Sequence, residues 1–126
     1  MKQKPISELE QLVMNIIWTK KNSSVKDVVE ALQKEKKLAY TTVATILQRL
    51  FSKGLVTRKE HKFGYIYSPK LSKEKYSKNI ARTFLDKFVD SFGDIAIASF
   101  AESIDKLPGK KREYFLKLLE ENDKSK

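Results

Sequence analysis

The first 71 residues carry three amphipathic segments in succession, followed at once by two short β-rich runs. Within each amphipathic segment the apolar residues recur at spacings of three and four, which is the pattern of a helix with one buried face. These apolar positions are Leu9, Leu12, Val13, Ile16 and Ile17, then Val25, Val28, Val29 and Leu32, then Val43, Ile46, Leu47, Leu50 and Phe51. Matched stripes of this kind predict a small three-helix core.

Local signals mark where these helices begin and end. Ser7 with Glu10, and Ser24 with Asp27, have the spacing at which side chains cap the first turn of a helix. Gly54 follows the third segment and is the residue type that accepts the left-handed conformation just beyond a helix end. The three helices are therefore expected to be short and separated by tight connections.

The two β-rich runs complete a recognisable order of elements. Residues 55–60 and 65–68 flank Lys62-Phe63-Gly64, a glycine-bearing turn of hairpin length. Three helices followed by a two-stranded ribbon is the order of the winged helix-turn-helix, in which the third helix lies in the DNA major groove and the ribbon touches the backbone beside it. We expect a mostly α fold with a small β-hairpin wing.

The outward face of the third helix supports this interpretation. At about 100° per residue, the face opposite the apolar stripe carries hydroxyls, an amide and an arginine, and no acidic residue occurs from Leu38 to Lys59. Such side chains can approach a polyanion and pair with base edges. Those expected at or near the bases are Thr41, Thr42, Thr45, Gln48 and Arg49. The alternative is that small polar residues are merely tolerated on a short surface helix.

The charge of the chain favours the same kind of partner. It has 26 basic and 16 acidic residues, a net charge of +10. Residues 1–71 hold 14 of the basic and 6 of the acidic residues, so most of the excess lies in the first half. The side chains expected on DNA phosphates are Lys53, Arg58, Lys59 and Lys62.

Residue types exclude several other classes of protein. There is no cysteine and His61 is the single histidine, so thiolate or multi-histidine metal sites are not expected, and neither is any cofactor. The longest apolar run, Ile95–Ala98, is far shorter than the roughly 20 residues of a bilayer span. The N-terminus does not resemble a secretory signal, so we expect a cytoplasmic protein without membrane contact. An enzyme is the weaker alternative, because no phosphate loop or nucleophile motif occurs.

Residues 72–126 predict a three-helix dimerisation segment after a winged-helix domain at 1–71. Ser72 is expected to cap the first helix, Gly93 to end it and Asp94 to cap the second. So short a segment cannot enclose its large apolar residues well, and a twofold homodimer would bury them. The expected interface is Tyr76, Ile80, Phe84, Leu85, Phe88, Phe92, Ile97, Phe100, Ile104, Phe115, Leu118 and Leu119. The alternative is a monomer whose helical cap folds back on the winged helix.

Three stretches of the chain resemble the penicillinase-repressor (BlaI/MecI/CopY) family. Residues 40–50 and 53–56 are similar to its recognition-helix pattern, Thr-Val-x-Thr-Leu-Leu-x-Arg-Leu followed by Lys-Gly. Residues 9–18 resemble the family's Glu-x-x-Val-Met-x-x-Ile-Trp, and residues 64–69 resemble its hairpin. The resemblance implies a dimeric winged-helix repressor that occupies a pseudo-palindromic operator in double-stranded DNA. The alternative is an architectural protein that coats DNA without sequence preference.

Departures from the family pattern limit what the resemblance implies. Leu38-Ala39 replaces a common Trp-Ser, and the paired Cys-x-Cys motifs of the copper-responsive members are missing, which excludes copper sensing by that chemistry. In the β-lactam-responsive members, induction involves cleavage of an Asn-Phe bond in the middle helix of the dimer segment, and Ser99-Phe100 occupies the matching place. A regulatory protease is therefore an expected partner. The alternative is that Phe100 is only a core aromatic.

Overall fold

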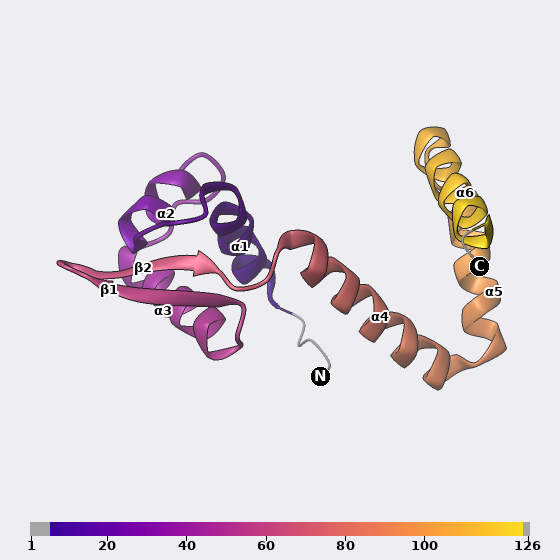
Figure 1. Ribbon diagram of the computed structural model, residues 1–126, viewed down its shortest axis with the longest axis horizontal. Helices are drawn as coiled ribbons and strands as arrows, with labels where there is room; N and C mark the ends of the chain where they lie inside the picture. Colours follow the sequence, from indigo (N-terminus) through magenta and orange to yellow (C-terminus); the bar gives the residue numbers. More distant parts are fainter. Residues whose placement is uncertain (1–5, 125–126) are drawn as a thin grey trace. The chain divides into compact units, whose positions relative to one another are not determined.

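The computed structural model describes residues 6–124, which form two compact units, one up to Thr83 and one from Phe84 onward. The elements are labelled in Figure 1. In chain order they are α1 (Glu8–Lys20), α2 (Val25–Leu32), α3 (Tyr40–Ser52), β1 (Val56–His61), β2 (Gly64–Pro69), α4 (Lys73–Phe92), α5 (Asp94–Asp105) and α6 (Gly109–Lys124). The predicted fold class, mostly α with a winged helix-turn-helix at the N-terminal end, is confirmed.

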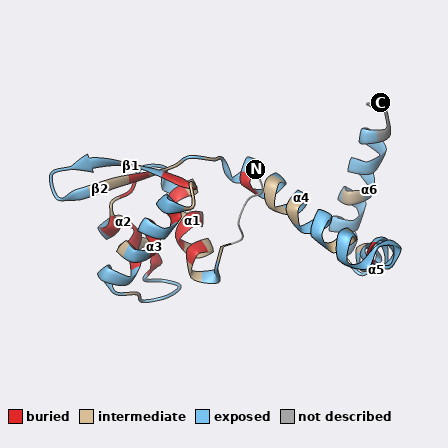
Figure 2. Ribbon diagram, turned by 90° about the horizontal axis from the view of Figure 1, so that it is seen from below, coloured by how far each residue is buried: buried red, intermediate tan, exposed pale blue. Residues whose placement is uncertain are grey.

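The core of the first unit lies among α1, α2 and α3, with β1 against α3 and β2 against α1. Buried residues concentrate in these helices, as the red segments of Figure 2 show. The buried hydrophobic residues are Val13, Met14, Ile17, Val25, Val28, Leu32, Val43, Ile46, Leu47, Leu50, Leu55, Val56, Tyr67 and Tyr76. The apolar stripes of α2 and α3 therefore face inward as predicted, except that Phe51 is exposed.

The buried face of α1 differs from the expected stripe. Glu10, Val13, Met14 and Ile17 are buried, whereas the predicted members Leu9, Leu12 and Ile16 are only partly buried. The buried face therefore includes a carboxylate, and burial of a carboxylate requires a partner for its charge.

Both predicted capping boxes are present. The backbone N–H of Glu10 donates to the Ser7 hydroxyl (3.2 Å), and the Ser7 N–H donates to the Glu10 carboxylate (3.0 Å). Ser24 and Asp27 repeat the arrangement at the start of α2, at 3.1 and 3.0 Å. These bonds satisfy backbone donors that a helix start leaves unpaired.

The end of α3 is a left-handed turn at Gly54, whose φ is +78°. The Gly54 N–H donates to the Phe51 carbonyl (3.0 Å) and the Leu55 N–H donates to the Leu50 carbonyl (3.0 Å), which together make a Schellman motif. Leu50 and Leu55 are both buried, so the residues on either side of the turn are part of the core.

The wing is an antiparallel hairpin closed by Lys62 and Phe63, with His61 opposite Gly64. Its second strand is tied to the loop between α1 and α2, because Ser23 and Tyr67 exchange backbone hydrogen bonds of 3.0 and 2.8 Å. Tyr67 is 3% exposed. Tyr67 therefore anchors the wing in the core of the first unit.

The start of α4 belongs to the first unit, and two of the residues expected at the dimer interface lie in this part of it. Ser72 caps the helix, as predicted, by accepting from the Lys75 N–H at 3.0 Å. Tyr76 lies against Trp18, with ring centroids 5.4 Å apart, and is 6% exposed, while Ile80 packs on the same core. Tyr76 is therefore part of the winged-helix core and Ile80, partly buried, packs against it. Any place of these two residues in a dimer stays a prediction. The boundary of the compact units falls within α4, later than the expected 71/72; the functional division of the chain stays a prediction.

The second unit is built from the end of α4, α5 and α6. Rings follow one another along α4, with centroids 5.7 Å apart for Phe84 and Phe88 and 5.5 Å for Phe88 and Phe92. Gly93, with φ of +60°, ends the helix as predicted. Asp94 was expected to cap α5, but the cap position belongs to Gly93, no side chain caps it, and Asp94 is the first helical residue.

Gly54→Ala should lower the free energy of unfolding by about 1–2 kcal/mol, because an alanine strains the left-handed turn. No heavy atom other than those of its chain neighbours lies within 4 Å of the added methyl group, so backbone strain is the whole cause. Gly54→Asn is the matched variant and should lose less, since asparagine tolerates this conformation. Urea unfolding measures both. A Gly54→Ala protein as stable as the wild type would contradict the turn.

Candidate nucleic-acid interface

The outer face of α3 gathers the residues expected to meet DNA bases. Because Val43, Ile46, Leu47 and Leu50 point into the core, the opposite face of the same helix is turned outward. All of the residues expected at the bases are exposed, namely Thr41, Thr42, Thr45, Gln48 and Arg49. The Thr45 hydroxyl donates to the Thr41 carbonyl (2.9 Å), so it keeps acceptor capacity but has its proton engaged within the helix.

Arg58 joins the wing to the end of the same helix. Its guanidinium carbon lies 4.0 Å from the centroid of the Phe51 ring and 4.3 Å from the centroid of the Tyr65 ring. Aromatic rings on the guanidinium hold the side chain in one place, which a flexible lysine could not match. Phe51, which the α3 stripe placed in the core, is instead exposed and contacts Arg58.

Two lysines of the wing that are expected to contact DNA phosphates lie close to Arg58 in the sequence. Lys59 is on β1 and Lys62 is in the turn, and both are exposed. Nothing in the described part of the chain engages either ammonium in a salt bridge. Their assignment to phosphates stays a prediction.

Lys53 is placed differently from the other expected phosphate contacts. Its ammonium donates to both carboxylate oxygens of Glu10, at 2.9 and 3.0 Å. The Glu10 side chain is 6% exposed and that of Lys53 is 29% exposed. Sequence reasoning missed this pair, because the capping box explains Glu10 locally and no periodicity connects positions 43 apart.

The ion pair sets the protonation of Glu10. Burial alone would raise the pKa of this carboxyl, but hydrogen bonds from Lys53 and Ser7 outweigh that effect and hold the pKa below its ordinary value of 4.5. The backbone N–H of Ser24 likewise lowers the pKa of Asp27 below 3.8, against a smaller opposing effect of burial. Both carboxylates are therefore charged at neutral pH.

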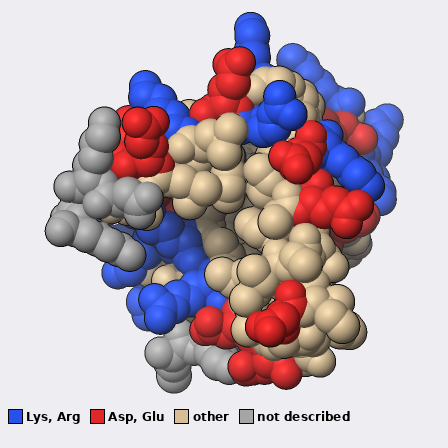
Figure 3. Space-filling model, turned by 90° about the vertical axis from the view of Figure 1, so that its right-hand side faces the viewer, with Lys and Arg blue, Asp and Glu red and all other residues tan. Residues whose placement is uncertain are grey.

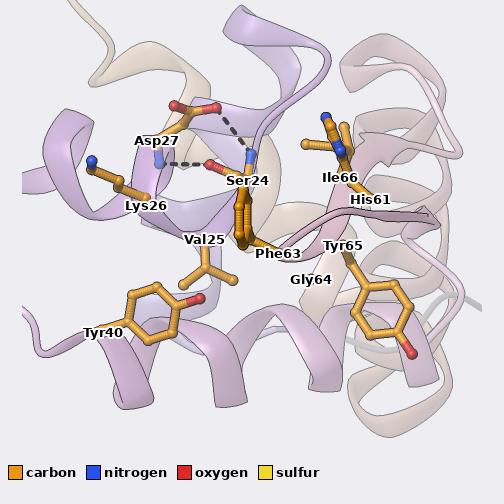
Figure 4. Close-up of a pocket in the computed structure, with 10 residues that line it drawn as sticks. All are labelled: Ser24, Val25, Lys26, Asp27, Tyr40, His61, Phe63, Gly64, Tyr65 and Ile66. Atoms are coloured by element: carbon orange, nitrogen blue, oxygen red, sulfur yellow. Dashed lines mark hydrogen bonds between the residues drawn. The ribbon is translucent and has the colours of Figure 1, made fainter.

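A groove of about 400 Å³ runs between the start of α2, the start of α3 and the wing. Figure 4 shows the aromatic side chains of Tyr40, Phe63 and Tyr65 around it, with the capping bonds of Ser24 and Asp27 at one edge. No group of three or more histidine, cysteine or acidic side chains suited to a metal ion occurs within residues 6–124.

The three-helix core, the hairpin and the exposed face of α3 define a winged-helix protein of the transcription-regulator class. The chain belongs to the penicillinase repressor family, whose model matches residues 6–121. Its members are transcriptional repressors, not enzymes, as the sequence predicted. Within residues 6–124, no helix is both long enough and apolar enough to cross a bilayer.

Relatives extend over most of the chain. The penicillinase repressor of Staphylococcus aureus is 34% identical over 102 residues, which are 81% of each chain. The penicillinase repressor of Bacillus licheniformis is 28% identical over 121 residues, 96% of this chain and 94% of the relative. The solution structure of the Bacillus licheniformis BlaI monomeric form in complex with the blaP half-operator has a TM-score of 0.50 and 28% identity, and covers 60% of this chain and 92% of that one.

Stability should fall in acid as the lowered carboxyl groups are protonated. The ionised carboxylates of Glu10 and Asp27 contribute fully to the free energy of unfolding above their ordinary pKa values of 4.5 and 3.8. This contribution is lost as the pH falls through the lowered pKa values of the folded protein. Glu10→Gln should be less stable than the wild type at pH 7, by a margin that shrinks in acid. Urea unfolding across pH 2–7 measures this, with Glu74→Gln, an exposed pair with Lys78, as the control. A margin independent of pH would contradict the assignment.

Proposed function

We propose that the chain is a dimeric repressor of transcription that binds a pseudo-palindromic operator in double-stranded DNA. The observation that carries the proposal is the exposed face of α3, where hydroxyl, amide and guanidinium groups project from a helix that has no acidic residue. Membership of a family of repressors, and a relative whose structure contains a half-operator, support it.

In this proposal, α3 lies in the major groove and the wing lies along the adjacent backbone. Arg49 and Gln48 offer groups that can pair with purines, and the exposed threonines offer methyl groups and acceptor oxygens. The rings of Phe51 and Tyr65 stack on the guanidinium of Arg58. The N–H donors at the edge of a stacked guanidinium can still bind a phosphate. Lys59 and Lys62 supply further positive charge to the backbone.

The proposed dimer rests on apolar surface in the second unit. Among its described residues only Ala96 is a buried hydrophobic residue. Phe84, Phe92 and Ile97 are about 60% exposed, at 62%, 59% and 58%. Figure 3 shows one face of the molecule on which uncharged surface runs between basic and acidic side chains. A second copy of the same segment would remove these groups from water, which is the usual driving force for a twofold interface.

The remaining members of the expected interface are distributed over the same three helices. Leu85, Leu118 and Leu119 are exposed, and Phe88, Ile104 and Phe115 are partly buried. Phe100, the residue after the expected cleavage position, is 41% exposed, and its ring centroid lies 6.3 Å from that of Phe115. Relief of repression by cleavage between Ser99 and Phe100 is proposed from the family resemblance, with Phe100 as a packing aromatic the alternative.

Variants on α3 and on the wing should separate base recognition from charge neutralisation. The probe is the duplex that the wild-type protein selects from a random double-stranded library, compared with a scrambled duplex of equal length. Arg49→Ala should lower the ratio of the two affinities by about tenfold, because a base contact is lost. Lys59→Ala should weaken both duplexes alike and reduce the slope of log K against log salt by about one.

The control is Lys87→Ala, which removes the same charge from the second unit. It should change neither the affinity ratio nor the salt slope. If no duplex is selected above the others, the protein is an architectural DNA-binding protein and not an operator-specific repressor.

The dimer should be sensitive to a charge in the row of rings on α4. Phe88→Glu places a carboxylate where two neighbouring rings meet it, and an unpaired charge in a desolvated interface costs several kcal/mol. Sedimentation should show a dimer for the wild type and a monomer for the variant at about micromolar concentration. Lys87→Glu, an exposed position of the same helix, should remain dimeric. A wild-type monomer would favour a helical cap instead.

A further inference from the structure

The buried ion pair joins the end of α3 to α1. Lys53 follows the last residue of α3, and its ammonium makes hydrogen bonds of 2.9 and 3.0 Å to the two carboxylate oxygens of Glu10. The Ser7 N–H also donates to this carboxylate, at 3.0 Å. Glu10 is 4% exposed, and it is the one buried charged residue among those whose side chains the structure describes.

A pair in such a position is better suited to fixing geometry than to adding stability. Removing a carboxylate from water is unfavourable, and the attraction to an ammonium returns that free energy only when the geometry is good. The apolar contacts of α3 with α1 and α2 are not directional, so they tolerate small slides and rotations of the helix. Two hydrogen bonds from one ammonium to one carboxylate are directional and oppose such movements.

The other end of α3 has no comparable polar anchor. Its cap residue, Ala39, makes no side-chain hydrogen bond, and the hydroxyl of Thr45 bonds within the helix. Arg49 lies one helical turn before Lys53, so both side chains leave the helix on neighbouring sides. The Lys53 N–H also donates to the Arg49 carbonyl at 2.9 Å, so a backbone hydrogen bond joins the two residues.

The same carboxylate also faces the start of α4. Burial raises the pKa of the Tyr76 phenol, and the nearby charge of Glu10 raises it further. Tyr76 packs on Trp18, whose indole N–H donates to the Leu71 carbonyl at 2.9 Å. Glu10 thus lies near Tyr76 as well as Lys53, so its carboxylate is close to residues of both α4 and the end of α3.

We infer that Lys53 is a positioning residue and not a phosphate contact: its ion pair with buried Glu10 fixes α3 on α1 so that the exposed face of α3 meets the operator in one register. This inference rests on the proposed function as a DNA-binding repressor. Glu10, which is buried, then becomes a determinant of operator specificity.

The experiment compares Glu10→Gln, Lys53→Met and Lys53→Arg with the double variant Glu10→Gln/Lys53→Met. Affinities for the selected duplex and the scrambled duplex are measured over a range of salt concentrations, on protein whose folding is checked by circular dichroism. Each of the first two changes should lower the affinity ratio by about tenfold, the size expected when base contacts move out of register. The double variant should lose no more than either single change, because both remove the same interaction.

The salt dependence distinguishes positioning from phosphate contact. If Lys53 positions α3, the slope of log K against log salt is unchanged in all variants, and Lys53→Arg recovers part of the specificity lost in Lys53→Met. If Lys53→Met reduces the slope by about one while Glu10→Gln leaves binding intact, Lys53 contacts a phosphate and the inference is overturned. If both changes lower the melting temperature but leave the affinity ratio of the folded protein unchanged, the pair is only structural and the inference is likewise overturned.

Two further comparisons distinguish failure of the inference from misfolding and from failure of the proposed function. Glu10→Leu/Lys53→Met replaces both charges with apolar groups and keeps the net charge, so it tests the affinity ratio even where a single change prevents folding. A wild-type protein that selects no duplex refutes the proposed function itself, whereas a specific wild type with equally specific variants refutes only the role of the pair.

Discussion

Burial of the inner face of α3 against α1 and α2 is the interaction on which the other parts of the winged helix depend. Val43, Leu47 and Leu50 have no exposed surface, so the side of the helix that carries them is fixed as its inner face. That orientation turns the polar face outward and leaves it free of competing contacts. Because Leu55 is buried directly after the Gly54 turn, the same packing also sets where the first strand of the wing begins.

Polar contacts then refine what apolar packing leaves adjustable. At the end of α3, Lys53 is bound to α1 through Glu10, while Phe51 is bound to the wing through Arg58. The exposed surface of α3 is thus connected to the core and to the wing by two different kinds of charged contact. Under the proposed function, a residue on this surface can consequently affect recognition through the angle of the helix as well as through a contact of its own with DNA.

Sequence reasoning reached the fold because helix periodicity, caps and turn residues are local signals. The capping boxes at Ser7 and Ser24, the Gly54 turn and the hairpin are all present where they were predicted. It failed where a residue's environment depends on distant parts of the chain. Tyr76 has the spacing of a dimer residue, yet its ring packs on that of Trp18 in the first unit. Lys53 forms its ion pair with Glu10, a residue 43 positions away in the sequence. The exposed residues of α3 were predicted as a set, since one helical face follows from periodicity alone, and their contact with bases stays a prediction.

Trp18 occupies a position with a practical consequence. It is the single tryptophan of the chain, its indole N–H is bound to the Leu71 carbonyl, and its ring lies on Tyr76. Indole emission depends on the polarity and hydrogen bonding of its surroundings. The intrinsic fluorescence of the protein therefore reports on one place, the junction where α4 leaves the winged helix, and follows the docking of that helix without any added label.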